Sequence, residues 1–425
     1  MLKTKTSLIE LSTSQKWFMV AVASLLFFYN FTLLNCINPL VSQLMHDFSI
    51  SATQMGILSS MYFYGICITV IPAGLLLDHI SSIKSILLCS MVVHILSIFG
   101  FAFSHSFFMA GFFRFLLGIA GGFAGLSCIY FASKWLPAKQ MAFANGFILA
   151  LGMFGGMLAQ TPTELLSQHF GWRYTLVIFS IIGILIFAII WLVVIDPPQK
   201  QKVRKDKNDF LKNIYYVVAN KKNWLAGLYI TSINLPIFVL GTLWGSLYLT
   251  QAHSFSIKQA SSIISMLFLG ILIGSPLIGF LSDKFRRRLI PMKLASVFIL
   301  IIILSIIYLK NISFVDEMVL FFLLGLFSGA QTISYALITE INITPVIAKA
   351  ISIALFLGMT SGFIFQPLFG WLIDLNWNHT IVHNLNIYSP ENFKIAMLMF
   401  PISFIVSLLL AFLLKETYCK RIIKQ

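Results

Sequence analysis

Arg114 is a permanent cation inside an otherwise uncharged stretch, GFFRFLLGIAGG (residues 111–122). Its guanidinium offers five N–H donors in a planar fork, which can bind a carboxylate through two parallel hydrogen bonds. A buried cation needs a partner, yet no Asp or Glu lies inside the first four apolar segments of the chain. Two interpretations follow. Arg114 either donates to backbone carbonyls and Asn30 of the first segment and braces the helices, or keeps part of its charge for an anion such as a substrate carboxylate.

Neutral polar and aromatic side chains in the apolar segments are candidates for one binding site with Arg114. Amides at membrane depth need hydrogen-bond partners, so their presence there favours a functional role. The candidates are Asn30, Asn35, Tyr64, Gln160, Asn234, Trp244, Gln331, Tyr335 and Gln366. Gln160 and Gln366 each stand one or two residues before a proline. A proline frees a carbonyl one turn earlier and bends or breaks the helix, which creates a polar spot.

The chain shows no constellation that catalysis or metal binding would require. It has no Gly-Lys-Ser/Thr phosphate loop, no His/Cys cluster with metal-ligand spacing and no nucleophile triad. We therefore expect neither an enzyme nor a bound cofactor or metal. Besides Arg114, His94 is the single deep ionisable residue in the first half. If the protein moves a solute across a membrane, three mechanisms stay open. They are coupling to a co-transported proton, facilitated diffusion, and coupling through the substrate's own charge.

Twelve apolar stretches must position these side chains. Only 10% of the 425 residues are charged and 59% are hydrophobic, whereas a soluble protein has roughly 25% charged residues. A helix needs about 20 apolar residues to cross a hydrocarbon core of ~30 Å. The expected spans are 17–39, 53–77, 84–104, 107–132, 140–161, 173–195, 224–250, 258–281, 290–309, 315–339, 347–373 and 394–414. The sequence therefore predicts an all-α polytopic membrane protein.

The net charge of +15 is explained by membrane topology. With the N-terminus inside, most of the 29 Lys and Arg residues fall in cytoplasmic segments, as the positive-inside rule requires. Both termini are therefore expected in the cytoplasm, and nucleic-acid binding is disfavoured. Residues 1–16 are polar and the first apolar run is too long for a signal peptide, so this span is expected to stay in the membrane.

A basic, polar interval at residues 196–223 divides the chain. The expected domains are residues 1–195 and 224–425, each a six-helix bundle, and the interval is expected to be a cytoplasmic linker. Residues 51–78 align with residues 256–283 at several Gly, Gln and Asp positions, which shared hydrophobicity alone would not produce. Gln160 and Gln366 also align. The halves are thus expected to be pseudo-symmetric repeats with parallel topology, and such transporters bind substrate near the midplane between the repeats.

Three motifs resemble those of the major facilitator superfamily. They are GLLLDHISSIK (74–84), GFLSDKFRRR (279–288) and RFLLGIAGG (114–122). The resemblance implies the major facilitator fold, in which two six-helix bundles alternate access to a central site. It also implies a gating role for Asp78, Asp283, Arg287 and Arg288. Carboxylates at such helix ends can bind a neighbouring helix N-terminus or basic side chains and hold one side shut. The first copy of the loop has fewer basic residues than the second, which predicts a looser latch.

Four further stretches are similar to the bacterial phagosomal nutrient transporters. They are FFYNF (27–31), FGWR (170–173), LWGSLYL (243–249) and QPLFGWLID (366–374). This resemblance implies uptake of amino acids or nucleosides. The family often carries a Glu and an Arg in the first span, and the corresponding residues here are Asn30 and Leu34. Charge-dependent coupling therefore does not transfer from the family to this chain.

Together these features favour a secondary active or facilitative transporter that works by alternating access. We expect it to move a small polar nutrient, with an amino acid as the best candidate, across the bacterial inner membrane. The expected protein is multi-pass and monomeric, with a small-molecule substrate and the lipid bilayer as partners. An exporter of a drug or siderophore is the alternative with the same fold, and a non-transporting membrane receptor is the alternative of another class.

Overall fold

The computed structural model describes residues 12–79, 82–196, 215–309, 311–343, 346–375, 377–382 and 385–420. The first half comprises α1 (Thr13–Asn35), η1 (Asn38–Leu40), α2 (Val41–Phe48), α3 (Ala52–His79), α4 (Ile83–Ala102), α5 (Phe107–Trp135), η2 (Ala138–Gln140), α6 (Met141–Leu158) and α7 (Thr161–Val193). The second half comprises α9 (Lys221–Leu235), the π-helix η3 (Pro236–Trp244), α10 (Gly245–Ala252), α11 (Ile257–Lys284), α12 (Leu289–Tyr308), α13 (Phe314–Ser328), α14 (Gln331–Glu340), α15 (Ile347–Phe363), α16 (Phe365–Leu375), β1 (Ile381–Val382), β2 (Leu385–Asn386), α17 (Pro390–Met397) and α18 (Met399–Leu413).

The described helices are long and apolar enough for twelve membrane crossings. Ten helical stretches are long and apolar enough to cross a bilayer by length and composition. One of them, Phe143–Val193, has 51 residues, which at about 1.5 Å per residue is more than twice the thickness of the hydrocarbon core. It therefore supplies two crossings, α6 and α7, and the 28-residue helix α3 supplies another. The prediction of an all-α polytopic fold is confirmed, with a two-stranded hairpin, β1–β2, as its one addition among the described residues.

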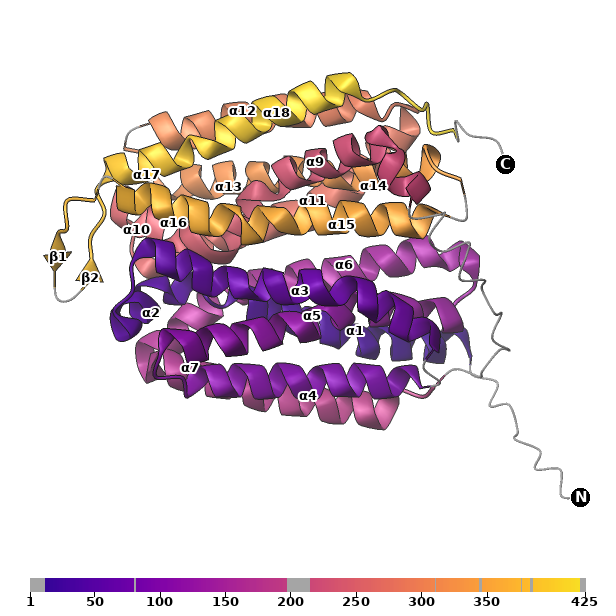
Figure 1. The fold of residues 1–425 in the computed structure, drawn as a ribbon, viewed down its shortest axis with the longest axis horizontal. Helices are drawn as coiled ribbons and strands as arrows, with labels where there is room; N and C mark the ends of the chain where they lie inside the picture. The colour runs from indigo at the N-terminus through magenta and orange to yellow at the C-terminus, as the bar shows by residue number, and fades with distance from the viewer. Residues whose placement is uncertain are drawn as a thin grey trace, which may run out of the picture.

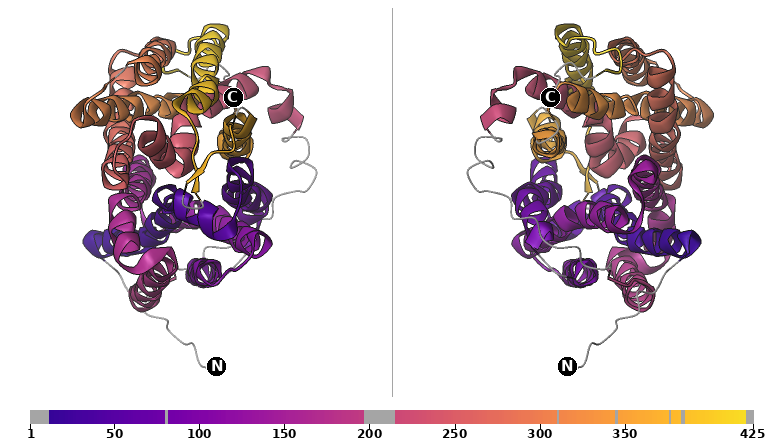
Figure 2. Two further views of the ribbon diagram at one scale, coloured as in Figure 1. Left: turned by 90° about the vertical axis from the view of Figure 1, so that its left-hand side faces the viewer. Right: turned by 90° about the vertical axis from the view of Figure 1, so that its right-hand side faces the viewer.

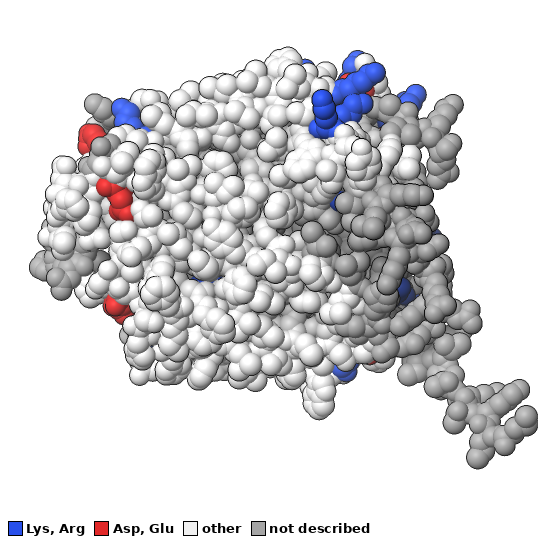
Figure 3. Space-filling model, in the orientation of Figure 1, with Lys and Arg blue, Asp and Glu red and all other residues white. Residues whose placement is uncertain are grey.

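The long helices run along one common direction, with α1–α7 on one side and α9–α18 on the other (Figure 1). Figure 2, viewed along that direction, shows the same two groups of helices. We call the end that carries Thr13 and Leu413 the terminus end, and the end that carries β1–β2 the hairpin end. In Figure 3 the Lys, Arg, Asp and Glu side chains gather at these two ends and leave an uncharged band between them. The halves meet where α3 packs on α15 and α16, and where α6 and α7 pack on α11.

Several expected spans are interrupted helices. The seventh contains the π-helix η3, which begins at Pro236, and the tenth divides at Gly329 into α13 and α14. The eleventh divides at Ile364, next to Gln366 and its proline. The helix α7 starts at Thr161, but a non-helical Gly171 with φ of 76° divides it, so the part that follows begins close to the expected residue 173. Hydropathy alone did not reveal these breaks, because the interrupted segments stay apolar throughout.

Glycines set the closest helix contacts in both halves. A Cβ on Gly118 of α5 would lie 2.0 Å from the carbonyl oxygen of Tyr62 on α3. A Cβ on Gly325 of α13 would lie 2.0 Å from the carbonyl oxygen of Leu267 on α11. The two pairs occupy corresponding places in the two repeats. Each contact brings backbone against backbone, which only a residue without a side chain allows.

We predict that Gly118→Ala separates α3 from α5 and destabilises the protein by about 2 kcal/mol or more, because the new methyl group overlaps a carbonyl that cannot move alone. Gly146→Ala on α6 is the matched control, since nothing lies within 4 Å of its added Cβ. Thermal unfolding in detergent measures both. Equal midpoints for the two variants would contradict this account of the α3–α5 contact.

Candidate functional site

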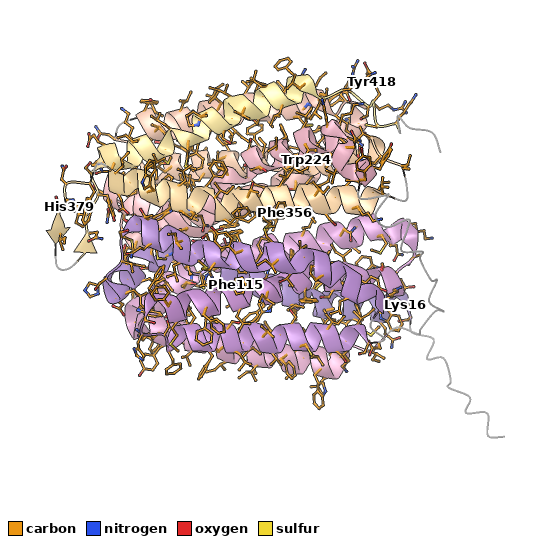
Figure 4. The ribbon with its side chains drawn as sticks, viewed as in Figure 1. Lys16, Phe115, Trp224, Phe356, His379 and Tyr418 are labelled. Atoms are coloured by element: carbon orange, nitrogen blue, oxygen red, sulfur yellow. The ribbon has the colours of Figure 1, made fainter. Side chains whose placement is uncertain are left out.

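Helix α5 places Arg114 in the interior of the first half, where the side chain is 1% exposed. The next residue, Phe115, lies between the two ends of the bundle (Figure 4). Arg114 Nη1 donates to the carbonyl oxygen of Leu33 on α1 at 3.2 Å, and the guanidinium carbon lies 5.5 Å from the ring centroid of Tyr62. Nε and Nη2 have no hydrogen-bond partner among the described residues. The cation thus keeps two of its three nitrogens available.

Asn30 does not serve as the partner of Arg114. Its Oδ1 accepts a hydrogen bond from the Tyr62 hydroxyl at 2.9 Å and lies 3.0 Å from Nε2 of His94. Nδ1 of His94 lies 2.7 Å from the carbonyl oxygen of Ser90, which can only accept. In the neutral ring, Nδ1 therefore carries the hydrogen. Among the described residues, Arg114 therefore braces the helices only through one hydrogen bond to the Leu33 carbonyl and one cation–π contact with Tyr62.

The repeat-related glutamines converge on the π-helix η3. Gln160 Nε2 donates to the carbonyl oxygens of Gly241 at 3.3 Å and Asn35 at 3.5 Å, and Gln366 Nε2 donates to that of Phe238 at 2.6 Å. A π-helix displaces carbonyls from the regular α-helical pattern, and the amides bind two of them. Both glutamines are fully buried, and Oε1 of each has no partner among the described residues. The Oε1 atoms of Gln160 and Gln366 are thus two unpaired hydrogen-bond acceptors beside the seventh span.

Asn35 and Asn38 join α1 and η1 to the same π-helix. The Asn38 amide donates to the carbonyl oxygens of Leu240 and Gly241, both at 2.6 Å, and its oxygen accepts from the backbone N–H of Ser246 at 2.8 Å. Oδ1 of Asn35 accepts from the hydroxyl of Thr242 at 2.9 Å. Asn38 was missed by sequence reasoning, although its place before Pro39 at the end of an apolar run was a usable signal.

Two of the remaining candidates donate hydrogen bonds to backbone carbonyls. Trp244 donates through Nε1 to the carbonyl oxygen of Gln366 at 3.0 Å and stacks on Phe369. Tyr64 donates to the carbonyl oxygen of Phe363 at 3.4 Å and so reaches from α3 to the second half. Three other candidates, Asn234 on α9 and Gln331 and Tyr335 on α14, form no hydrogen bond with Arg114 or the glutamines among the described residues.

The gating candidates at the terminus end form a network within the second half. Arg288 donates to Asp283 at 2.6 Å and to Glu340 at 2.7 Å. Burial lowers the pKa of Arg288, but Glu340 and Asp283 outweigh it and hold that pKa above its ordinary value. The Arg287 guanidinium lies 4.7 Å from the ring centroid of Tyr418. The side chain of Asp78 lies outside the described residues.

At the hairpin end a carboxylate of the second half caps a helix of the first. Asp374 of α16 accepts from the backbone N–H groups of Ala52 at 3.2 Å and Thr53 at 2.7 Å, and from the Thr53 hydroxyl at 2.6 Å. The Tyr388 hydroxyl donates to the same carboxylate at 3.0 Å. These N–H groups begin α3, where a negative charge also complements the helix dipole. The sequence analysis did not single out Asp374.

A helical bundle in two halves, with a desolvated cation inside one half and unpaired amide oxygens beside the π-helix of the other, defines a class of protein: a multi-pass membrane protein with buried polar groups. The sequence profile of the Major Facilitator Superfamily matches residues 21–243 and 228–421. The chain therefore belongs to the Major Facilitator Superfamily, whose members are transport proteins and not enzymes.

Two relatives carry names that refer to sugar acids. The "Probable galactarate/D-glucarate transporter GudP" of Bacillus subtilis is 26% identical over 313 residues, which cover 65% of this chain and 66% of the relative. The "D-galactonate transporter" of Escherichia coli is 24% identical over 284 residues, which cover 58% and 62%. Each match thus spans less than two thirds of the relative. Similarity to phagosomal nutrient transporters is not confirmed by these matches.

A solved structure shares the fold along nearly the whole chain. It is a bacterial homolog to the human lysosomal transporter Spinster in an inward-facing and occupied conformation. The match has a TM-score of 0.74 and 19% sequence identity, and it covers 95% of this chain and 97% of the other. At this level of identity the likeness concerns the fold alone.

We predict that Arg114→Met raises the unfolding midpoint of the ligand-free protein, because it removes a buried cation that lacks a counter-charge; the expected gain is about 1–4 kcal/mol. Arg173→Met is the matched control. Arg173 donates to the carbonyl oxygens of Ala102 at 2.8 Å and Ser104 at 2.7 Å, so its loss should destabilise by about 2 kcal/mol. A lower midpoint for Arg114→Met would show that the guanidinium is paired after all.

Proposed function

We propose that this protein is a secondary transporter of a small hydroxylated carboxylate, which it moves across the bacterial inner membrane by alternating access. The observation that carries the proposal is the Arg114 guanidinium, fully buried with Nε and Nη2 unpartnered. A carboxylate can occupy these two donors at once. The unpartnered Oε1 atoms of Gln160 and Gln366 can accept from hydroxyl groups of the same substrate.

A sugar acid fits this arrangement better than the amino acid expected from the sequence. A carboxylate neutralises the single cation, whereas a zwitterion brings a second cation that would need its own counter-charge on leaving water. Arg114 has no ion pair with a carboxylate among the described residues. Names of relatives point the same way, since they refer to galactarate, D-glucarate and D-galactonate. Amino acids are the competing substrate class and belong in the same test.

The cargo proposal is tested by ligand-induced stabilisation of purified protein with D-galactonate, D-glucarate and neutral amino acids. A sugar acid at about 100 times its Kd should stabilise the wild-type protein by about 2.7 kcal/mol. Arg114→Gln should weaken the affinity by roughly 30-fold or more, because one partner of a desolvated charge pair is lost. Flux into proteoliposomes separates a transporter from a receptor and import from export. Stabilisation by amino acids alone, or equal binding by Arg114→Gln, would refute the proposal.

For the movement, we propose that residues 1–195 and 224–425 turn as two units joined by the linker 196–223, with the terminus end in the cytoplasm. The excess of Lys and Arg toward that end supports the orientation. Hydrogen bonds between the halves gather toward the hairpin end, where Asn38 binds Leu240 and Gly241 and Asp374 binds Thr53. The structure is thus closed toward the hairpin end, and transport requires these contacts to break and re-form.

We predict that a Thr161→Cys/Ser262→Cys pair, in a chain without its five native cysteines, forms a disulfide that blocks transport reversibly. The two native hydroxyl oxygens, one from each half, lie 3.3 Å apart. Adding Asp374→Asn should slow cross-linking several-fold, because the cap on α3 is weakened and the open state gains population. Asp316→Asn, an exposed carboxylate bonded only near its own helix start, is the control. Unchanged cross-linking in Asp374→Asn would exclude this cap from gating.

A further inference from the structure

Glu317 is a buried carboxylate that sequence reasoning did not single out. It lies in the first turn of α13, at the hairpin end, and its side chain is 0% exposed. Neither Oε1 nor Oε2 has a hydrogen-bond partner among the described residues. The nearest ionisable group is His253, just after α10, whose Nδ1 lies 3.5 Å from Oε1. A carboxylate with no donors is unstable in such a place unless it carries a proton or faces a cation.

Hydrogen bonds around Tyr248 determine whether Nε2 of His253 carries a hydrogen. Nε2 is the ring nitrogen that contacts Tyr248, and Nδ1 is the one that lies near Glu317. The Tyr248 hydroxyl donates to the carbonyl oxygen of Ile306 at 3.1 Å, and a carbonyl can only accept. The single hydroxyl hydrogen is thus used, and the Tyr248 oxygen accepts from Nε2 of His253 at 2.8 Å. Nε2 therefore carries a hydrogen. In a neutral imidazole the other nitrogen, Nδ1, then carries a bare lone pair, 3.5 Å from Oε1 of Glu317.

A lone pair facing an ionised carboxylate without a hydrogen between them is repulsive, and burial strengthens the repulsion. Two arrangements remove it: an imidazolium beside a carboxylate, or a neutral imidazole beside a carboxylic acid. Both contain one proton more than neutral His253 with ionised Glu317. Burial lowers the pKa of His253, which favours the second arrangement. The proton count is the same in either case.

We propose that His253 and Glu317 form a proton-binding site at the hairpin end of the second half, which takes up one proton from the solution on that side. Uptake adds a proton to the lone pair of Nδ1 or to the carboxylate and breaks no bond. The site joins the end of span seven to the start of span ten. The site lies within one half, so it is not part of the path between the halves. We therefore assign it a regulatory role, in which external pH controls the stability of the contact between the end of α10 and the start of α13.

Aromatic rings flank the pair, and Asp316 is the charged neighbour that acts on Glu317. Phe255 lies parallel to the His253 ring with centroids 6.3 Å apart, and Phe314 contacts Phe255 edge-on. The His253 side chain is 15% exposed, which gives the proton a route to water. The other titratable groups on the elements around the pair, in their parts near the hairpin end, are His46 and Asp47 on α2, Tyr248 on α10, Lys258 on α11, Tyr308 on α12, Asp316 on α13, and Glu391 and Lys394 on α17. Of these, Asp316 is exposed and accepts from Ser313, and Lys394 lies over the Tyr308 ring.

The proposal fixes the sign of the pH dependence of stability. In the unfolded chain His and Glu titrate near 6.5 and 4.3. Above pH 6.5 the unfolded chain holds neither proton while the folded pair still holds one, so raising the pH favours unfolding. In Glu317→Gln the neutral amide replaces the protonated acid and the alkaline loss disappears. Below pH 6.5 this variant instead loses stability, since the unfolded His takes up a proton that the buried His253 resists.

The test is the thermal unfolding midpoint of the ligand-free protein from pH 5 to pH 9. Wild-type protein should lose stability above pH 6.5, by up to tenfold in the unfolding equilibrium constant per pH unit. Glu317→Gln should be flat in that range and fall below it, while Glu391→Gln, which changes an exposed carboxylate on α17, should follow the wild type. If Glu317→Gln does not fold, His253→Gln serves, because its amide donates to the carboxylate and should also abolish the alkaline loss.

Parallel pH profiles for wild type and Glu317→Gln, or an alkaline loss retained in both variants, would overturn the proposed site. The measurement uses no substrate, so its outcome is independent of the cargo proposed for Arg114. A protein that binds a sugar acid and shows no Glu317-dependent pH profile would retain the transport proposal and lose the proton site. The reverse result would retain the proton site alone.

Discussion

The structure depends on one constraint: a polar group taken out of water must find its partner inside the protein. Backbone groups meet it by forming helices, and where a helix is interrupted, side chains complete the hydrogen bonding. The π-helix η3 is the clearest case, because Asn38, Gln160 and Gln366 donate to carbonyls that it displaces. Arg114 is a conspicuous exception in the first half. A buried cation kept with two idle nitrogens is costly, and a ligand that completes its hydrogen bonds recovers that cost.

The two halves repeat the backbone contacts and differ in their buried charges. Gly118 and Gly325 make the same close approach to a neighbouring carbonyl in each repeat. The first half buries the cation Arg114 beside the Tyr62 ring and has a second buried charge, Glu164. The second half buries Glu317 beside His253 and pairs Arg288 with Glu340. The helix packing is thus repeated in the two halves, whereas the buried ionisable residues differ between them. A moving interface between such halves can be polar where they separate and tightly packed where they do not.

Sequence predicted what depends on local composition. Twelve crossings follow from apolar length, Arg114 stands out because charge is excluded around it, and Gln160 and Gln366 are marked by their prolines. Sequence did not show which partner each polar group takes, because that depends on packing between distant spans. Asn30 bonds to Tyr62 and not to Arg114, and Asp374 caps a helix more than 300 residues earlier in the chain. Glu164, Glu317 and Glu340 lie near helix ends, yet neighbouring helices cover all three, which the sequence alone does not show.

The π-helix has a consequence for how this chain tolerates insertions and deletions. Adding or removing one residue in an α-helix turns every later side chain by about 100°. Residues 236–243 precede Trp244, Tyr248 and His253 in one continuous segment. A single deletion there would rotate Tyr248 away from Ile306 and His253 and would turn Ser246 away from Asn38. The number of residues in this stretch is therefore as strongly constrained as their identity, and length variants should be rarer here than in the connecting loops.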